Sequence, residues 1–358
     1  MTEEVSQKYF VKNLIRWNRS ENNREMPWKG EKDPYKIWLS EIILQQTRVA
    51  QGLDYYHRFI AAFPTIQHLA KAPEVKVFKL WEGLGYYTRC KNLIATAKHI
   101  SKNLNGKFPD QYQDILALKG IGPYTAAAIG SFAFGLPYAV VDGNVFRVLA
   151  RYFGISTPID GLEGKKTFSS LANELLNKRQ PGEYNQAMMD FGAVVCKPKL
   201  PLCDSCGLSE NCKAFLKGNV QQLPVKEKTI VKKTRWLYYF QIEHKGNTYV
   251  RKRGANDIWE NLYELVLIES KGPEEISDLS HFKKLLGKNK FELLHISPIH
   301  KHLLTHLTIY GQFVKITVNN PIEIEGYKKV SKKAFDKLPF PKFISNYLSD
   351  KNVPLNLF

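Results

Sequence analysis

The 358-residue sequence lacks long uninterrupted hydrophobic runs, internal repeats and low-complexity tracts. Its longest apolar stretch, residues 126–141, is broken by glycine, serine and proline. That stretch is also shorter than the roughly 20 residues that a membrane-spanning helix needs. The first residues, MTEEVSQKYF, are acidic and polar and lack the basic and then apolar pattern of an export signal. We therefore expect a cytoplasmic protein without a membrane partner.

Cysteine is scarce, and four of the five cysteines lie in one short segment. In a reducing compartment they are not expected to form disulfides. Six, two and five residues separate the four, so one short loop carries four thiolates, which can bind either a zinc ion or a four-iron cluster. The four are Cys196, Cys203, Cys206 and Cys212, and the fifth, Cys90, is expected to be an ordinary half-buried thiol.

Acidic residues are in deficit, with 34 Asp and Glu against 52 Lys and Arg and a formal net charge of +18. The sequence pI is about 9.5. This charge favours a polyanionic partner, for which nucleic acid is the best candidate, although a merely basic surface is the alternative. The 44% of hydrophobic residues is enough to bury the cores of two domains in a chain of this length.

The apolar pattern changes along the chain and predicts two domains. Before the cysteines, apolar residues recur every three or four positions, which predicts helices at 33–52, 75–84, 88–100 and 110–118. Asp33 and Pro34 are typical of a helix start. We expect a mainly α domain over residues 1–219 that includes the cysteine loop at 196–212, a polar and basic linker over 220–234, and an α+β domain over 235–358.

The second domain carries strand patterns and two helical patterns. A hairpin is predicted from residues 236–244 and 248–253 around a turn at 245–247. Further strands are predicted at 263–269, 291–296 and 306–317, and helices at 281–287 and 332–348.

The segment LKGIGPYTAAAIG, residues 118–130, predicts two helices joined by a tight turn. Gly120 and Gly122 can adopt positive φ, and without a Cβ they let a phosphate approach the N–H groups that begin the second helix. Lys119 adds positive charge, and the alanines allow the helices to pack closely. This pattern indicates a helix-hairpin-helix, which binds the DNA backbone without reading sequence.

Several motifs resemble one family of DNA repair enzymes. LKGIGPYTAAAI together with VVDGNVFRVLARYFGI is similar to the helix-hairpin-helix and Gly/Pro and Asp loop of the endonuclease III superfamily of DNA glycosylases. REMPWKGEKDPYKIWLSEIILQQTRV and WEGLGYYTRCKNL resemble the branch that removes adenine mispaired with 8-oxoguanine. The resemblance covers about residues 20–215. It implies a monomer that acts on duplex DNA with adenine opposite 8-oxoguanine or G, associated with the nucleoid in a prokaryote.

The cysteine spacing resembles the [4Fe-4S] loop of the same superfamily, so the resemblance favours that cluster over zinc. It also bears on Tyr124. Related bifunctional enzymes carry at this position a lysine that attacks C1′ and forms a Schiff base leading to strand cleavage. Tyrosine cannot do this, so the sequence predicts a monofunctional enzyme that uses water.

Two carboxylates are candidates for the catalytic groups, one as the general acid and the other as the anion that stays ionised. On a helix, Glu41 has apolar neighbours such as Trp38 and Leu44, so desolvation should raise its pKa, as a general acid requires. Asp142 precedes a helix, whose N–H groups and dipole should keep it ionised. The resemblance assigns catalytic roles to both and makes Asn144 the water-positioning amide. A buried ion pair for Glu41 and a simple helix cap for Asp142 are the structural alternatives.

A base within a duplex must be flipped out before such groups can reach it. By resemblance, Gln46, Thr47 and Tyr86 enter the gap that the base leaves. By the same resemblance, Arg24, Trp28 and Gln186 line the adenine pocket, where the amide could make two hydrogen bonds. These side chains could instead be structural.

The second domain resembles the Nudix-like domain that adenine glycosylases use to recognise 8-oxoguanine. A start of the Nudix box at 254–260 is not followed by REXXEE, so no pyrophosphate hydrolysis is expected. The family's Phe-Ser-His corresponds to Leu304, Thr305 and His306, of which Thr305 and His306 could contact the lesion. The three neighbouring histidines, His300, His302 and His306, have no thiolate or carboxylate beside them to complete a metal site, so they are expected to be solvated loop residues.

Two other functions remain as alternatives. An endonuclease III-like pyrimidine glycosylase and lyase is disfavoured by Tyr124 and by the C-terminal domain. A DNA-binding protein without catalytic activity is disfavoured because both Glu41 and Asp142 are present.

Overall fold

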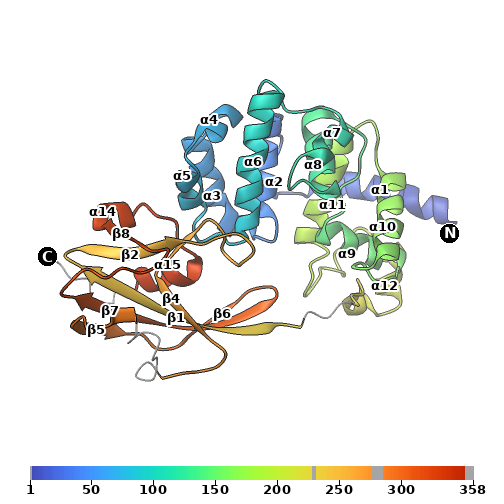
Figure 1. The fold of residues 1–358 in the computed structure, drawn as a ribbon. Coiled ribbons are helices and arrows are strands. Elements are labelled where there is room, and N and C mark those ends of the chain that lie inside the picture. The colour runs from blue at the N-terminus through green and yellow to red at the C-terminus, as the bar shows by residue number, and fades with distance from the viewer. Residues whose placement is uncertain (1, 228–230, 276–284, 351–358) are drawn as a thin grey trace. The chain divides into compact units, whose positions relative to one another are not determined.

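The computed structural model describes residues 2–227, 231–275 and 285–350 and divides the chain into two units (Figure 1). The first unit comprises Met1–Ala70 and Ala95–Lys228, and the second comprises Lys71–Ile94 and Thr229–Phe358. A segment of the helical region therefore belongs with the C-terminal strands. In the described part of the chain, we find no helix with the length and apolar character needed to cross a membrane.

The first unit is helical, as the sequence predicted. It contains α1 (Glu3–Ser20), α2 (Pro34–Leu44), α3 (Val49–Ala62), α4 (Ile66–Lys71), the later part of α6 (Tyr87–Asn103), α7 (Tyr112–Ala117), α8 (Pro123–Phe134), α9 (Gly143–Phe153), α10 (Leu162–Leu175), α11 (Pro181–Val194), α12 (Lys213–Leu216) and the short 3-10 turns η1 (Ser209–Asn211) and η2 (Val220–Gln222).

The start of α2 agrees with the prediction, but its end does not. The Asp33 carboxylate accepts a hydrogen bond of 2.9 Å from the Tyr35 N–H and caps the helix, with proline in its first turn. The predicted helix over 33–52 is wrong, because α2 ends at Leu44 and α3 begins at Val49. Gln46 lies between them with a φ of 56°, which an α-helix cannot include.

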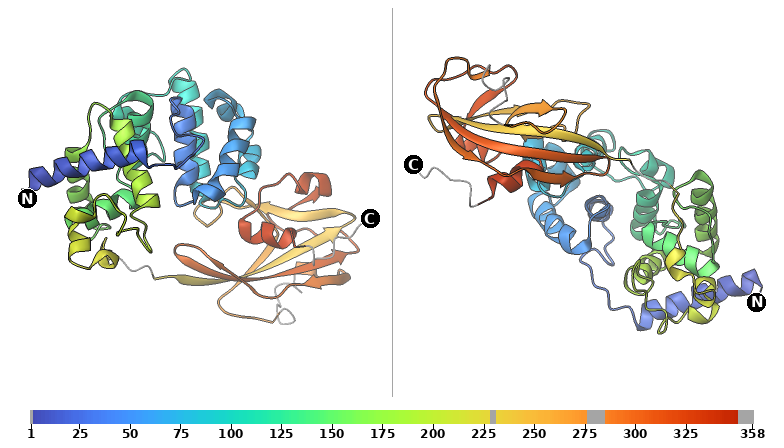
Figure 2. Two further views of the ribbon diagram at one scale, coloured as in Figure 1. Left: turned by 180° about the vertical axis from the view of Figure 1, so that it is seen from behind. Right: turned by 90° about the horizontal axis from the view of Figure 1, so that it is seen from below.

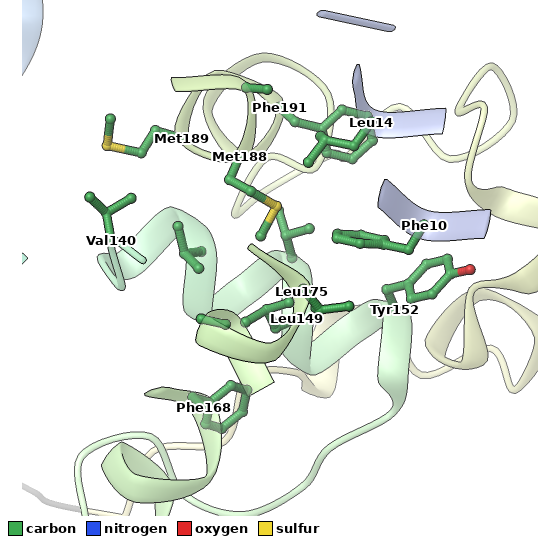
Figure 3. Close-up of a cluster of buried hydrophobic side chains, with 14 of the residues drawn as sticks. Phe10, Leu14, Val140, Leu149, Tyr152, Phe168, Leu175, Met188, Met189 and Phe191 are labelled. Atoms are coloured by element: carbon green, nitrogen blue, oxygen red, sulfur yellow. The ribbon is translucent and has the colours of Figure 1, made fainter. Parts of the chain in front are cut away.

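One buried core of the first unit is built around α1, α9, α10 and α11 (Figure 3). Phe10 and Leu14 of α1 pack in the same cluster as Tyr152 of α9 and Met188 of α11. Each fully buried side chain of this size contributes about 1.5–3 kcal/mol relative to an exposed one. The core thereby fixes α9, which Asp142 caps, against α11, which carries Gln186.

The second unit is a mixed β-sheet with short helices. The described strands are β1 (Lys233–His244), β2 (Asn247–Lys252), β3 (Tyr263–Glu264), β4 (Val266–Ser270), β5 (Phe291–Ile296), β6 (His300–Leu303), β7 (Leu307–Val318) and β8 (Lys328–Ser331). The helices are α5 (Glu74–Trp81), the first part of α6, α14 (Lys332–Phe335) and α15 (Lys342–Leu348).

The described strands form one eight-stranded sheet, with the order β3-β2-β1-β7-β5. The long strands β1 and β7 run parallel, and β4, β6 and β8 pair with β1, β7 and β2. The predicted hairpin and the strands at 291–296 and 306–317 are present. The predicted strand at 263–269 is divided into β3 and β4, and the sequence did not predict β6 or β8. Part of the predicted helix at 281–287 lies outside the described residues.

Alternating side chains of β1 cover the two faces of the sheet. The helix α15 lies against one face of the sheet (Figure 2). Tyr239 lies on this face, where Phe343 and Tyr347 of α15 pack on Phe313 of β7. Tyr238 belongs to a separate buried cluster with the next alternate residues of β1. The proline-containing segment 338–341 divides the predicted helix 332–348 into α14 and α15.

The segment 71–94 is held in the second unit by polar contacts. The Lys79 ammonium donates to the Leu338 carbonyl at 3.0 Å, and Lys91 forms a 2.7 Å ion pair with Glu260. Cys90, on α6, is fully buried rather than half-buried, and burial raises the pKa of its thiol well above the usual value.

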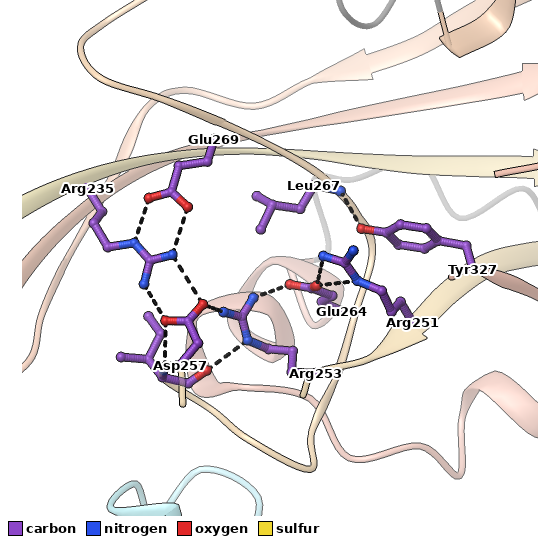
Figure 4. A network of polar contacts seen from close by, with 9 residues as sticks. Arg235, Arg251, Arg253, Asp257, Glu264, Leu267, Glu269 and Tyr327 are labelled. Carbon is purple, nitrogen blue, oxygen red and sulfur yellow. Dashed lines mark hydrogen bonds and ion pairs between the residues drawn. The ribbon is translucent and has the colours of Figure 1, made fainter. Parts of the chain in front are cut away.

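A network of arginines and carboxylates connects β1, β2, β3 and β4 (Figure 4). Glu264, which is 1% exposed, accepts hydrogen bonds from Arg251 and Arg253. Arg253 also contacts Asp257, and Asp257 pairs in turn with Arg235. Every buried charge in this network therefore faces an opposite charge, which is what burial of ions requires.

Candidate active site

A cavity of about 1200 Å³ lies in the first unit, and most of the predicted site residues line it. Both candidate carboxylates face the same space, so the sequence hypothesis passes its main geometric requirement. The predicted residues that line the cavity are Arg24, Trp28, Glu41, Gln46, Thr47, Gly122, Tyr124, Asp142, Asn144 and Gln186.

Glu41 lies on α2 and is 7% exposed. Its pKa is raised to about 7, mainly by burial, as its apolar neighbours predicted. A hydrogen bond from the Tyr124 hydroxyl lowers this pKa, and the charge of Asp142 adds to the rise. Near neutral pH, therefore, a large share of Glu41 carries a proton that it can donate.

Asp142 is the N-cap of α9. Its Oδ1 accepts hydrogen bonds from the Asn144 and Val145 N–H groups at 2.9 and 2.8 Å, and its Oδ2 accepts one from the Asn144 side chain at 2.7 Å. Burial nevertheless raises the pKa of Asp142 above its usual value, which the helix-end argument did not foresee. Three hydrogen-bond donors stabilise the ionised form of Asp142, whereas one stabilises that of Glu41. As the pH falls, Glu41 therefore takes up a proton before Asp142 does.

Tyr124 stands near the start of α8, and its hydroxyl contacts the other candidate groups. It donates to Glu41 and lies 3.5 Å from the Met189 sulfur. Burial and the nearby carboxylates raise the pKa of Tyr124 well above its usual value. The side chain is thus a neutral donor at physiological pH, and it brings no amine to the cavity.

Asn144 is held by a residue that the sequence analysis missed. Arg147, one turn further along α9, donates to the Asn144 Oδ1 at 2.8 Å and to the Cys196 carbonyl at 2.7 Å. A Cβ at Gly192 would lie 2.6 Å from the Asn144 Cβ, so glycine permits α11 to approach here. The three-residue spacing from Asn144 to Arg147 is the signal that could have indicated this pair.

Arg24 and Gln186 meet at a second missed residue, Asp190. The Arg24 Nη1 lies 2.7 Å and the Gln186 Nε2 lies 2.9 Å from the same Asp190 oxygen. Trp28 is buried, with its ring 5.3 Å from that of Tyr56. Gln186 and Asp190 are four residues apart on α11, and this spacing in the sequence is the signal that could have indicated the contact.

The turn between α7 and α8 is built as predicted, with one difference. Gly120 has a φ of 81°, whereas Gly122 has a φ of −100° and serves as the N-cap of α8. A Cβ on Gly122 would meet no atom within 4 Å, so the backbone there is open to an incoming group. Lys119 is exposed, and its carbonyl accepts a hydrogen bond of 2.8 Å from Thr96.

Three predicted site residues belong to the second unit. Tyr86 is 46% exposed and has a left-handed φ of 49°, a strained conformation for an aromatic residue. Thr305 and His306 are exposed in the turn between β6 and β7. The expectation of solvated loop histidines is wrong for His300 and His302, which lie on β6. The His302 ring lies against Trp259 and Phe343, and burial lowers its pKa.

The four cysteines of the loop line one small apolar cavity of about 30 Å³. Burial raises the pKa of the Cys206 thiol to about 11 and raises those of Cys203 and Cys212. The Arg151 guanidinium lies 3.4 Å from the Cys196 sulfur and also donates to the Lys197 carbonyl at 2.7 Å. In the described residues, no three His, Cys, Asp or Glu side chains converge as a site for a metal ion. Four thiols around an apolar space beside one guanidinium nevertheless fit the donor set of an iron–sulfur group.

Comparison with known proteins supplies the family. Residues 39–175 match the HhH-GPD superfamily of base excision DNA repair proteins, and residues 238–350 match the NUDIX domain. The adenine DNA glycosylase of Buchnera aphidicola from Baizongia pistaciae is 35% identical over 315 residues, which cover 87% of this chain and 86% of the relative. The chain belongs to the adenine DNA glycosylase family.

Two further likenesses agree with this family. The adenine DNA glycosylase of Buchnera aphidicola from Acyrthosiphon pisum is 34% identical over 342 residues, with 94% of each chain covered. A solved thermostable thymine-DNA glycosylase is 31% identical with a TM-score of 0.56 and covers 60% of this chain and 98% of its own. The protein is thus a DNA N-glycosylase of base excision repair, with a helical helix-hairpin-helix domain and a Nudix-like domain rich in strands.

Proposed function

We propose that this glycosylase excises adenine opposite 8-oxoguanine, or opposite G, and does not cut the strand. The observation that carries the proposal is the pairing of Glu41 and Asp142 in one cavity, with the Tyr124 hydroxyl where related lyases have an amine. The relatives are adenine DNA glycosylases, which supports adenine as the base.

The proposed chemistry uses one proton donor and one anion. Glu41 donates its proton to the flipped adenine as the bond from C1′ to the base breaks, and the leaving base carries away the bonding electrons. Asp142 stabilises the positive charge that develops on the sugar. A water held by Asn144 then adds to C1′ and gives up its proton to a carboxylate. Arg24, Trp28 and Gln186 would bind the base.

DNA is the proposed polyanion, and both units would bind it. The turn with Lys119, Gly120 and Gly122 would hold a phosphate at the start of α8. Gln46, Thr47 and Tyr86 would fill the gap left by the flipped base. The left-handed φ of Gln46 and Tyr86 supports such specialised roles. Thr305 and His306 would contact the 8-oxoguanine.

We further propose that Cys196, Cys203, Cys206 and Cys212 hold a [4Fe-4S] cluster. When bound, the cluster would cross-link this loop without entering the hydrolysis. We also propose that the protein is a monomer in the cytoplasm, associated with the nucleoid in a prokaryote. A linker over 220–234 would join its two domains, residues 1–219 and 235–358.

One assay tests the reaction class. Duplexes with adenine opposite 8-oxoguanine, and duplexes with thymine glycol opposite adenine, are incubated with the protein with and without alkali. Nicks that require alkali and occur only at the adenine support the proposal. Cleavage at the glycol without alkali would establish the endonuclease III-like lyase instead, and binding without cleavage would establish a non-catalytic protein.

Glu41→Gln is the matched variant for this assay. It should reduce excision by a factor on the order of 10²–10⁴, because it removes the general acid. DNA affinity should stay within a few-fold, because the amide has the same shape. Undiminished turnover in this variant would remove Glu41 from the proposed role.

A further inference from the structure

Asp190 is fully buried on α11 and is saturated with hydrogen bonds. One oxygen accepts from the Arg24 Nη1 at 2.7 Å and from the Gln186 Nε2 at 2.9 Å. The other accepts from the Asn22 Nδ2 at 2.9 Å and pairs with the Lys29 ammonium at 3.2 Å. A carboxylate has about four acceptor sites, so Asp190 uses all of them on its neighbours. The residue therefore has no acceptor site left for a substrate.

The chemistry of a carboxylate decides the orientation of the Gln186 amide. An ionised carboxylate only accepts hydrogen bonds, so the NH₂ group of Gln186, and not its carbonyl, must face Asp190. The Gln186 carbonyl oxygen is consequently directed away from the carboxylate. In the part of the chain that the structure describes, no donor is hydrogen-bonded to this oxygen, and Gln186 lines the large cavity.

We propose that Asp190 is a positioning residue that sets base specificity through Gln186. It holds the amide so that the Gln186 carbonyl oxygen accepts a hydrogen bond from an exocyclic amine of the flipped base. A purine with a carbonyl oxygen in that place would be rejected. This inference rests on the proposed excision of adenine.

Adenine and hypoxanthine differ in the group at C6, which is the group that the Gln186 oxygen would contact. Adenine carries an amine at C6, which donates, whereas hypoxanthine carries an oxygen there, which accepts. Facing the Gln186 oxygen, the hypoxanthine oxygen would find no donor and would be repelled. The second N–H of Gln186 stays available for a ring nitrogen, so two hydrogen bonds to adenine remain possible. Base discrimination of this kind amounts to about tenfold or more.

Asp190→Asn tests the inference because the two side chains have the same shape. An asparagine has one accepting oxygen in place of two, so it cannot accept from all four donors around residue 190. The Gln186 amide is then no longer held in one orientation and can turn over to direct its own NH₂ into the cavity. Single-turnover excision is measured on duplexes with adenine or with hypoxanthine opposite 8-oxoguanine. The ratio of the adenine rate to the hypoxanthine rate should fall by about tenfold or more.

Gln186→Met supplies the matched control. Methionine has a similar size but does not present the amide, so the ratio should fall in this variant too. Adding Asp190→Asn to Gln186→Met should then change the ratio no further, because Asp190 acts through the amide. If Asp190→Asn slows both bases equally, or changes the ratio equally with methionine at 186, Asp190 is merely structural and the inference is wrong.

The outcomes separate this inference from the proposed function. Wild-type protein that excises no adenine contradicts the proposed function, whereas adenine excision with an unchanged ratio in Asp190→Asn contradicts only the role of Asp190. The thermal unfolding midpoint shows whether Asp190→Asn folds. If it does not, Gln186→Met alone decides, since an unaltered ratio there would mean that the amide does not distinguish the bases.

Discussion

Glu41 in the first unit and Glu264 in the second are both buried glutamates, but their partners differ. Glu264 accepts hydrogen bonds from two guanidinium groups, those of Arg251 and Arg253. Glu41 has the neutral hydroxyl of Tyr124 and a nearby carboxylate. Burial is therefore offset by two opposite charges in the second unit, whereas in the first it raises the pKa of Glu41 to about 7. What makes Glu41 suited to acid catalysis is the absence of a cation among its described hydrogen-bond partners.

In the cavity of the first unit, Asp142→Asn should strongly reduce excision. It removes the anion that stabilises the developing sugar cation, so excision should fall by a factor on the order of 10²–10³. The Asn oxygen can still accept from the N–H groups that begin α9, so the unfolding free energy should change by about 1 kcal/mol or less. Single-turnover excision and chemical denaturation measure the two quantities.

Asp33→Asn is the control for that variant, because Asp33 caps α2 in the same way. It should leave the excision rate unchanged within about twofold and change stability by a similar small amount. If both variants lose activity equally, capping rather than the cavity charge accounts for the loss.

In the second unit, Arg253→Met should break the ion pairing around Glu264. It leaves Glu264 and Asp257 with fewer partners, and removing one member of a buried pair costs about 3–5 kcal/mol. Arg235→Met removes an arginine whose partners, Asp257 and Glu269, are more exposed, so the loss should be about 1 kcal/mol. Urea denaturation of both variants checks the difference. Equal losses would show that burial does not distinguish the two pairs.

Local features of the site could be predicted from sequence. The cap formed by Asp33, the turn at Gly120 and the apolar surroundings of Glu41 each depend on residues within about four positions. Such short-range patterns determine the start of a helix and the face that a side chain occupies. For this reason the sequence indicated the helices and the surroundings of both carboxylates, whereas their catalytic roles came from the family resemblance.

Features that depend on distant contacts could not be predicted in this way. Arg24 and Asp190 are 166 residues apart, and only the folded chain brings them together. The raised pKa of Asp142 has the same origin, since other elements bury the residue and outweigh its helix-end hydrogen bonds. β6 was missed because its exposure alternates over only four residues, too few for a period to be recognised.

The pH dependence of excision tests whether Glu41, unlike Glu264, acts as a proton donor. Glu41 must be protonated to act, so the rate should fall about tenfold for each pH unit above a midpoint near its pKa of about 7. At low pH the rate should also fall, as Asp142 takes up a proton. Single-turnover rates between about pH 5 and about pH 9, with DNA binding measured in parallel, test this profile. A constant rate above neutral pH would contradict the role of Glu41 as acid.

Tyr124→Phe should produce the smallest effect of these variants, a shift in the midpoint of the pH profile. The Tyr124 hydroxyl stabilises the ionised form of Glu41 and lowers its pKa, so removing it should raise the midpoint of the pH profile, by less than about 1 unit. Tyr184→Phe is the matched control, because Tyr184 is a buried tyrosine whose hydroxyl has no hydrogen-bond partner in the described structure. That variant should leave the midpoint unchanged. A midpoint that moves down in Tyr124→Phe would show that Tyr124 stabilises the protonated acid, and the distinction between Glu41 and Glu264 would then need a different explanation.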